Sequence, residues 1–328
     1  MNCPACGKEV EPVDAKCPDC GVPVQAEVVR EITAKINSAE LLKQWEERAE
    51  KARGIKVIAS VGAKTDLGRV RENNEDKYEF FEPEDEDVLA LKGSFYAVAD
   101  GMGGHAAGQI ASELALKTAI GAYYADTSPM IEESLKAALQ QANALIYDAA
   151  RAISERQGMG TTMSALVIRG DEAFIAQVGD SRCYRLRDGK LRQLTDDHSW
   201  VNEQVKRGGL TPDEAAMSPF RNVITRSLGN APNVEVDVFF EELAEGDTFL
   251  LCSDGLTGEV SDDDLREFMM SGAPSLVAWN LVQLALDHGG RDNVTVMIVA
   301  VRDIVRGEAG EEPKRKKRKG LAGLLSRG

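Results

Sequence analysis

The sequence predicts an α+β domain in which antiparallel strands and helices form separate groups. Two observations predict this class: strand-like runs follow one another across short turns, and helical runs follow one another as well. Such grouping argues against a regular βαβ sheet, in which strands and helices alternate. A chain of 328 residues with 43% hydrophobic content is long enough for one sizeable domain with appendages.

The strand pairs are predicted from the turn residues between them. Residues 163–168 and 172–178 flank Arg169-Gly170-Asp171, and residues 182–187 and 190–194 flank Asp188-Gly189. An Asp-Gly pair between two strand-like runs is typical of a tight antiparallel hairpin, because both residues tolerate positive φ.

Helices are expected over residues 108–124, 131–154, 262–270 and 275–286. A further short helix is predicted to begin after Thr211, because Thr is a suitable N-cap, Pro212 fits the first helical position and Glu214 is an acid in the first turn. The acidic run 82–87 is expected to be a solvated loop without a function of its own.

Residues 1–24 are predicted to form a zinc ribbon. Cys3, Cys6, Cys17 and Cys20 follow the pattern C-x2-C-x10-C-x2-C, which provides four thiolates for a closed tetrahedral Zn²⁺ site. A unit this small needs its metal to fold. Two disulfides are the alternative, but they require an oxidising compartment that no other feature of the sequence supports.

Residues 25–55 are predicted to be an amphipathic helical linker. Apolar side chains recur there at spacings of three and four residues, from Val29 through Ile32 and Ile36 to Trp45 and Ala49. We expect this stripe to pack on the main domain or on the ribbon, and a coiled-coil or partner-binding role is the alternative.

The charge of the chain is unevenly distributed. The net charge is −15, and the last 16 residues contribute seven positive charges and no acid, so the remaining chain carries −22. An acidic body is unsuited to binding nucleic acid as a whole. Residues 306–328 are expected to be a basic, disordered tail, with contact to an anionic membrane or nucleic acid as the less favoured alternative. Since no signal peptide or apolar run of eighteen residues is present, a cytoplasmic location is expected.

Three aspartates lie where apolar, strand-like runs meet polar or glycine-rich turns. Asp100 follows residues 95–99, Asp254 follows residues 249–253, and Asp292 precedes residues 294–301. An ionised carboxylate at the end of a buried strand needs a compensating positive charge. Carboxylates without neighbouring His or Cys favour a hard cation such as Mg²⁺ or Mn²⁺.

Upstream of these acids, Arg71 stands a few residues before Glu75 and Asp76. Arg binds phosphate through two parallel hydrogen bonds, so the combination indicates phosphate chemistry. With these motifs the sequence resembles the metal-dependent protein Ser/Thr phosphatases of the PP2C (PPM) family over about residues 58–301. The matching segments, in the family's order, are 71–76, 100–105, 159–162, 178–182, 195–199, 253–255 and 290–293.

The resemblance implies a four-layer α-β-β-α sandwich over residues 56–305, with two antiparallel sheets face to face and a flap at about 197–229 beside the active site. It also implies the ligands of two Mn²⁺ or Mg²⁺ ions. Asp100 would bridge both ions, Asp254 and Asp292 would hold one, and Glu75 with the carbonyl of Gly101 would hold the other.

Further roles follow from the same resemblance. Asp76 would orient metal-bound waters, Arg71 would bind the substrate phosphate, and Asp180 matches a position that contributes to a third, weaker metal site. His105 is the candidate for proton delivery to the leaving oxygen, because His titrates near neutrality. The alternative is that His105 only hydrogen-bonds a metal-bound water or the backbone.

The implied function is hydrolysis of phosphoserine and phosphothreonine in proteins, by direct attack of a water that bridges the two ions. Its partners would be phosphorylated proteins, including a Ser/Thr kinase whose action it opposes, and a protein bound by the zinc ribbon. A zinc-ribbon adaptor or pseudophosphatase that only recognises phosphoproteins is the alternative. The intact set of acids argues against it, because loss of catalysis usually shows as a replaced ligand.

Overall fold

The computed structural model describes residues 43, 47, 52, 54–104, 106–270 and 272–307. The chain divides into two compact units, Met1–Glu46 and Glu47–Gly328. The predicted zinc ribbon, most of the helical linker, His105 and most of the basic tail lie outside the described residues. Of the linker, residues 43, 47 and 52 are helical.

The second unit contains two five-stranded antiparallel sheets. The first sheet has the order β1 (Ile55–Asp66), β12 (Val294–Arg306), β11 (Thr248–Cys252), β8 (Arg182–Arg187) and β9 (Lys190–Gln193). The second sheet has the order β10 (Asp237–Glu242), β7 (Glu172–Val178), β6 (Met163–Arg169), β3 (Ser94–Ala99) and β2 (Lys77–Phe81). β4 (Gly101–Met102) and β5 (Gly160–Thr161) form a separate two-stranded ladder. Both predicted hairpins are confirmed, as β6–β7 and β8–β9.

Alternation along the strands explains how the two sheets pack face to face. In β3, Tyr96 and Val98 belong to the apolar cluster between the sheets, whereas Phe95 and Ala97 belong to the cluster beneath the helices of the second sheet. Successive side chains of a strand point to opposite faces, so a strand that is apolar throughout is covered on both sides. The interface between the two sheets is therefore largely apolar.

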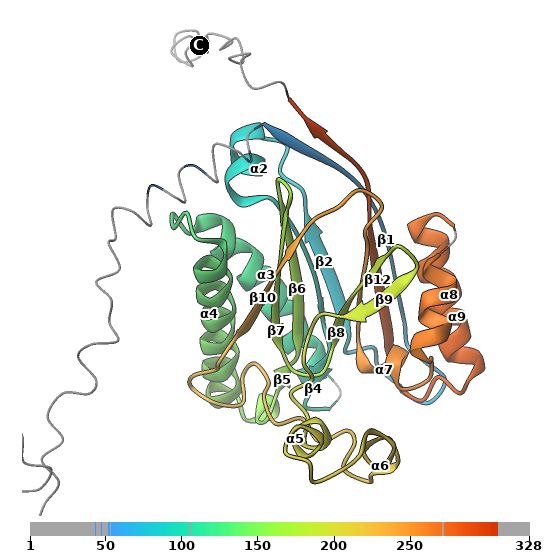
Figure 1. Cartoon of the computed structure of the whole chain (residues 1–328). Helices are drawn as coiled ribbons and strands as arrows, with labels where there is room; N and C mark the ends of the chain where they lie inside the picture. The colour runs from blue at the N-terminus through green and yellow to red at the C-terminus, as the bar shows by residue number, and fades with distance from the viewer. Residues whose placement is uncertain are drawn as a thin grey trace, which may run out of the picture. The chain divides into compact units, whose positions relative to one another are not determined.

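Helices cover the outer face of each sheet (Figure 1). α3 (Ala106–Ala125) and α4 (Ile131–Ala152) pack on the second sheet, and α8 (Asp262–Met269) and α9 (Pro274–Asp287) pack on the first. The predicted four-layer α-β-β-α sandwich is confirmed. The short helices α5 (Trp200–Lys206), α6 (Pro212–Met217) and α7 (Asp254–Thr257) lie at the same end of the sandwich as β4 and β5.

Local sequence signals account for two of the connections. Asp188 and Gly189 both have positive φ, 51° and 70°, as the tight turn between β8 and β9 requires. Thr211 and Glu214 form a reciprocal capping box at the start of α6, which confirms the predicted helix start.

One helix in the acidic run was not predicted. α2 (Glu86–Lys92) begins there, because Asp85 accepts hydrogen bonds from the backbone N–H groups of Asp87 and Val88. Glu86 and Asp87 in the first turn add favourable charge at the helix N-terminus. The expectation of a loop was thus wrong for the second half of the run.

Candidate functional site

The predicted acids come together at one end of the sandwich, and both sheets contribute. Asp100 follows β3, and Asp180 follows β7 in the same sheet. From the other sheet, Asp254 follows β11 and Asp292 precedes β12. The charges of Asp254, Asp180 and Asp292 all act on the carboxyl of Asp100, so strand ends far apart in the sequence form one acidic cluster.

The carboxyl groups of this cluster are held in an environment that opposes their ionisation. Burial is the main cause, and repulsion between neighbouring carboxylates adds to it. Together they raise the pKa of Asp76 to about 7 and that of Asp180 to about 8, and they raise the pKa of Asp100 and Asp254 as well. A bound cation would remove this penalty.

The unsatisfied oxygens of the cluster fit a hard cation. The Oδ1 atoms of Asp76, Asp180 and Asp254 are buried and have no hydrogen-bond partner. An all-oxygen donor set suits Mg²⁺ or Mn²⁺ rather than zinc. Among the described residues, no three His, Cys, Asp or Glu side chains converge closely enough to hold a metal ion as they stand. The acids are therefore an open cluster, and the assignment of each ligand to one ion stays a prediction.

Glu75 and Gly101 meet where the first turn of α3 reaches the cluster. A Cβ added at Gly108 would overlap the carboxylate Oε2 of Glu75, and one added at Gly101 would overlap the carbonyl of Gly108. The three residues therefore lie in contact, and only glycine fits at both positions. The predicted pairing of the Glu75 side chain with the Gly101 backbone is compatible with this arrangement.

Asn293 connects the loop of Glu75 to the loop of Asp292. Its Oδ1 accepts the backbone N–H of Glu75 at 2.9 Å, and its Nδ2 donates to the carbonyls of Leu67 and Asn73 at 2.8 and 2.9 Å. The sequence motif 290–293 contains Asn293, but no role for it was predicted. Its partners lie more than 200 residues away, which no local pattern reveals.

Ser253 performs a similar positioning role for Asp76. Its hydroxyl donates to Asp76 Oδ2 at 2.6 Å and accepts the backbone N–H of Thr295 at 3.0 Å. The side chain of Asp76 is fully buried between these segments. Asp76 therefore lies at the cluster, as predicted, but sequence reasoning missed the hydroxyl that fixes its orientation.

Two threonines hold the loop of Asp100 in place. Thr162 Oγ1 accepts the backbone N–H of Asp100 at 3.0 Å, and Thr161 Oγ1 donates to the carbonyl of Asp100 at 2.7 Å. Thr162 also shares a hydrogen bond of 2.7 Å with Ser181, next to Asp180. The loops that carry Asp100 and Asp180 are thus linked directly.

Arg71 lies beside the cluster, next to Asp292. Its Nη2 donates to Asp292 Oδ2 at 2.6 Å, and half of its side chain is exposed. Partial burial opposes the charge of Arg71, but the hydrogen bond to Asp292 and the charges of Asp292, Asp100 and Glu75 outweigh it and raise its pKa. The guanidinium is thus firmly cationic and accessible from solvent.

His198 links the flap to the loop that precedes Asp180. Its Nδ1 accepts the backbone N–H of Gly179 at 3.0 Å, so its Nε2 carries the proton and donates to Asp237 Oδ2 at 3.1 Å. Burial is the main cause that lowers the pKa of His198, and the charge of Arg226 lowers it further. These contacts agree with a structural role. His105, the candidate for proton delivery, lies outside the described residues.

A groove of about 540 Å³ runs from the cluster towards the flap. Asp180 and Asp254 of the cluster line it, as do Arg221 and Asn222 of the flap. Arg182 and Asp197 also line it and form an ion pair with two parallel contacts, at 3.0 and 2.7 Å. The groove therefore brings residues of the flap next to two of the acids.

Comparison with known proteins agrees with this geometry. The protein phosphatase 2C family matches residues 69–282. A serine/threonine phosphatase of Listeria monocytogenes is 39% identical over 248 residues, which cover 74% of this chain and 96% of that protein. The S. agalactiae serine/threonine phosphatase superposes with a TM-score of 0.68 at 37% identity and covers 75% of this chain and all of its own. The catalytic domain of the phosphatase PstP, solved with two manganese ions, gives a TM-score of 0.66 at 36% identity and covers 76% of this chain and all of its own. The chain belongs to the protein phosphatase 2C family of serine/threonine phosphatases.

Proposed function

We propose that this chain hydrolyses phosphoserine and phosphothreonine in proteins with the help of two Mn²⁺ or Mg²⁺ ions held by the acidic cluster. One observation carries the proposal: buried carboxylates from both sheets, three of them with an unsatisfied oxygen, converge beside an accessible guanidinium. This is the arrangement that a charged phosphate ester and its metal ions require.

The predicted ligand roles fit the described positions. Asp100, which lies near carboxylates from both sheets, would bridge the two ions. Asp254 and Asp292 would hold one ion, and Glu75 with the Gly101 carbonyl would hold the other. Asp76 would orient bound waters, and Asp180 would contribute to a third site. When bound, such ions supply a water of lowered pKa and screen the charge of the phosphoryl oxygens.

Arg71 would bind the phosphate and align it for attack. In the described structure its Nη2 contacts Asp292, so this bond must be exchanged for bonds to the phosphate. The side chain is 53% exposed, which leaves it accessible to a phosphate beside the cluster. Replacing Arg71 by Lys would retain the charge but lose the two parallel hydrogen bonds.

We infer a single-step reaction without a covalent phosphoenzyme. The two cysteines of the described residues, Cys183 and Cys252, are buried in strands, and burial raises the pKa of both thiols, so neither is a suitable nucleophile. His105 is proposed to deliver the proton to the leaving Ser or Thr oxygen, with hydrogen bonding to bound water as its alternative role.

The remaining proposals concern segments outside the catalytic domain. Cys3, Cys6, Cys17 and Cys20 are proposed to bind a structural Zn²⁺ ion and to present a surface for a protein partner. The substrates are proposed to include a Ser/Thr kinase, and the location is proposed to be the cytoplasm. No helix in the described part of the chain has the length and apolarity needed to cross a membrane.

Phosphate release from a phosphothreonine peptide at increasing Mn²⁺ tests the function. Loss of a residue that only orients a metal ligand typically reduces activity 10- to 100-fold, so Asp254→Asn should reduce it by more than about 100-fold. Asp263→Asn, an exposed acid on α8, is the matched control and should retain activity. A folded wild-type protein that released no phosphate at any Mn²⁺ or Mg²⁺ concentration would instead support the adaptor function.

A further inference from the structure

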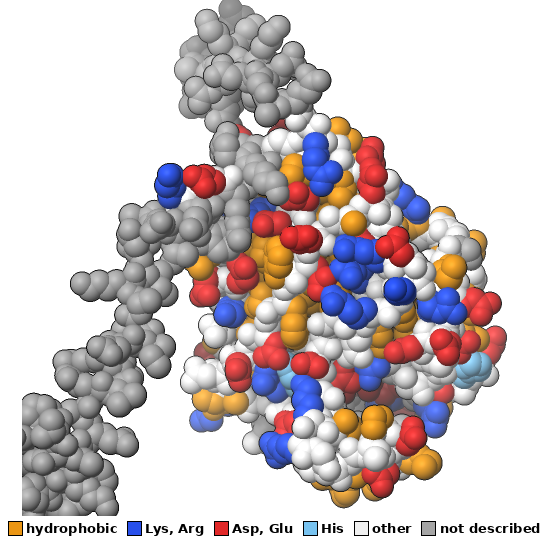
Figure 2. All heavy atoms as spheres, in the orientation of Figure 1, with side chains coloured by type: hydrophobic (Ala, Val, Ile, Leu, Met, Phe, Trp, Pro, Cys, Tyr) orange, Lys and Arg blue, Asp and Glu red, His pale blue; other side chains and the backbone are white. Residues whose placement is uncertain are grey.

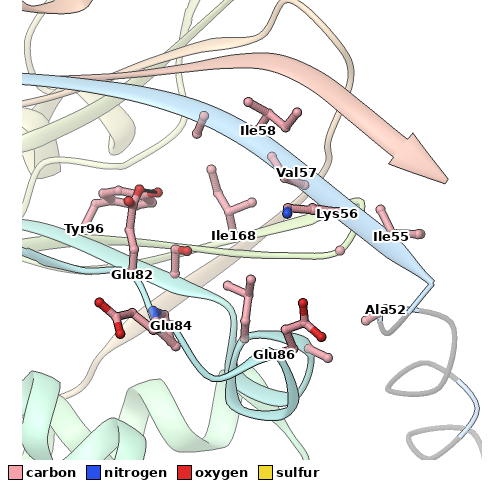
Figure 3. Close-up of a pocket in the computed structure, with 16 residues that line it drawn as sticks. Ala52, Ile55, Lys56, Val57, Ile58, Glu82, Glu84, Glu86, Tyr96 and Ile168 are labelled. Carbon is pink, nitrogen blue, oxygen red and sulfur yellow. Dashed lines mark hydrogen bonds between the residues drawn. The ribbon is translucent and has the colours of Figure 1, made fainter. Parts of the chain in front are cut away.

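A second groove lies at the opposite end of the sandwich from the acidic cluster. It has a volume of about 550 Å³ and lies between β1 and α2 (Figure 3). β3 runs from this groove to the acidic cluster: its first residue, Ser94, lines the groove, and its last residue, Ala99, is followed by Asp100. A ligand in this groove would therefore leave the catalytic cluster open.

The floor of the groove is apolar because the sandwich is incompletely closed at this end. β1 and β2 are the edge strands of the two sheets, so no further strand covers the gap between them. Tyr96 and Ile168 of the apolar cluster between the sheets line the floor, with Ile55 and Val57 of β1 beside them. Figure 3 shows these side chains between β1 and α2.

The side of the groove opposite β1 is acidic. Glu82, Glu84 and Glu86 line it, and Asp85 and Asp87 lie exposed in the same run. Among the described lining residues, Lys56 is the one cation. Elsewhere on the visible described surface, basic and acidic side chains are interspersed (Figure 2). The groove thus combines an apolar floor with a locally negative wall, which fits a segment that is both basic and apolar.

We propose that the C-terminal residues 314–325 of this same chain bind in this groove. Six consecutive cations, Lys314 to Lys319, are followed by Gly-Leu-Ala-Gly-Leu-Leu, so the segment offers positive charge for the glutamates and leucines for the floor. Its charge is opposite to that of the body of the chain. No other run of the sequence has as many consecutive cations.

The point at which the chain leaves the domain places this segment within reach. Arg306, the last residue of β12, pairs with Ile55, which lines the groove, and Gly307 N donates to the carbonyl of Gly54 at 2.8 Å. Six residues lie between Gly307 and Lys314, so the chain takes seven steps of about 3.5 Å each when extended, or about 25 Å in all. A short tether of this kind gives an effective concentration in the millimolar range, so individually weak contacts suffice.

Limited trypsin digestion of the full-length protein tests the proposal, because a bound basic segment is cut more slowly than a solvated one. Mass spectrometry follows cleavage within residues 314–319. In the double variant Glu84→Gln/Glu86→Gln we expect this cleavage to be about fivefold faster, because the tail loses two surface ion pairs, each of which contributes little on its own. Leu321→Ser/Leu324→Ser should accelerate it similarly, and about 0.5 M NaCl should accelerate it in the wild type.

Asp263→Asn/Glu267→Gln on α8 is the matched control, since it also removes two exposed charges from a helix, and it should leave the cleavage rate unchanged. Phosphatase activity on a small phosphopeptide should be unchanged in all these variants, which separates this proposal from the catalytic one. Equal tail cleavage in the wild type and both groove-directed variants would overturn the proposal. Protection of the tail that depends on protein concentration would also overturn it, because it indicates binding to a second copy. So would protection that appears only with anionic vesicles or DNA. Faster cleavage within residues 25–43, instead of within the tail, in the Glu84→Gln/Glu86→Gln variant would likewise overturn it.

Discussion

The fully buried carboxyl of Asp76 links the stability of the protein to pH. Burial is the largest influence on this group and raises its pKa from 3.8 to about 7, despite the opposing hydrogen bond from Ser253. In the unfolded chain the carboxyl ionises near 3.8, whereas in the folded, metal-free protein it stays protonated up to about pH 7. Between these values the folded state binds more protons, so its free energy of unfolding falls as pH rises.

The size of this effect follows from the pKa change. Each unit of pKa corresponds to about 1.4 kcal/mol, so the ionisation of Asp76 alone should cost the metal-free protein on the order of 4 kcal/mol between about pH 4 and pH 7. Asp76→Asn removes the titrating group and keeps an amide oxygen that can accept the hydrogen bond of Ser253. We expect this variant to be less dependent on pH and to be more stable than the wild type at about pH 8 without divalent cations.

Urea unfolding followed by circular dichroism, on protein dialysed free of Mn²⁺ and Mg²⁺, measures this dependence. Addition of Mn²⁺ at about pH 8 should stabilise the wild type, because an ion that binds only the folded state increases the free energy of unfolding. Asp263→Asn, which removes an exposed acid, should behave like the wild type. Constant stability of the metal-free wild type between about pH 4 and pH 7 would show that burial does not raise the pKa of Asp76. A loss of stability in Asp76→Asn as steep as in the wild type would show the same.

Two further predictions concern glycine and histidine positions. Gly108→Ala should weaken Mn²⁺ activation by at least about tenfold, because the added Cβ would displace the Glu75 carboxylate. Gly121→Ala lies in open space on the same helix and should add about 0.5–1 kcal/mol to the free energy of unfolding. Equal Mn²⁺ titrations for the two variants would contradict the prediction for Gly108. His198→Ala should lower the free energy of unfolding by about 2 kcal/mol, since it leaves the buried N–H of Gly179 without an acceptor, and a thermal melt unchanged from the wild type would show that water replaces the imidazole without loss.

Much of the fold could be predicted because its signals are local. The Asp188-Gly189 turn and the capping box of Thr211 each depend on a few neighbouring residues, and both are present in the structure. α2 was missed because its acidic first turn has the composition of a solvated loop, and only the hydrogen bonds of Asp85 show where it begins. The four-layer arrangement came from family resemblance rather than from periodicity.

The site was predictable in its acids but not in the residues that hold them. Each acid stands at a strand end, which is visible in the sequence, and family resemblance indicated which strand ends meet. The contacts of Ser253 with Asp76 and of Asn293 with Glu75 join residues 177 and 218 positions apart, and no spacing rule relates them. The ligand assignment to individual ions, the zinc ribbon of residues 1–24 and the role of His105 remain predictions.

The flap is fastened to the catalytic core at both of its ends. Leu228 exchanges two backbone hydrogen bonds with Thr161, at 2.8 and 3.0 Å, and the N–H of His198 donates to the carbonyl of Gly179 at 2.9 Å. Between these anchors, Met217 is mostly exposed and Phe220 is about half exposed. Mutations in the intervening stretch can therefore accumulate without shifting the carboxylates, so evolution could change which phosphoproteins are accepted while the chemistry of hydrolysis is inherited intact.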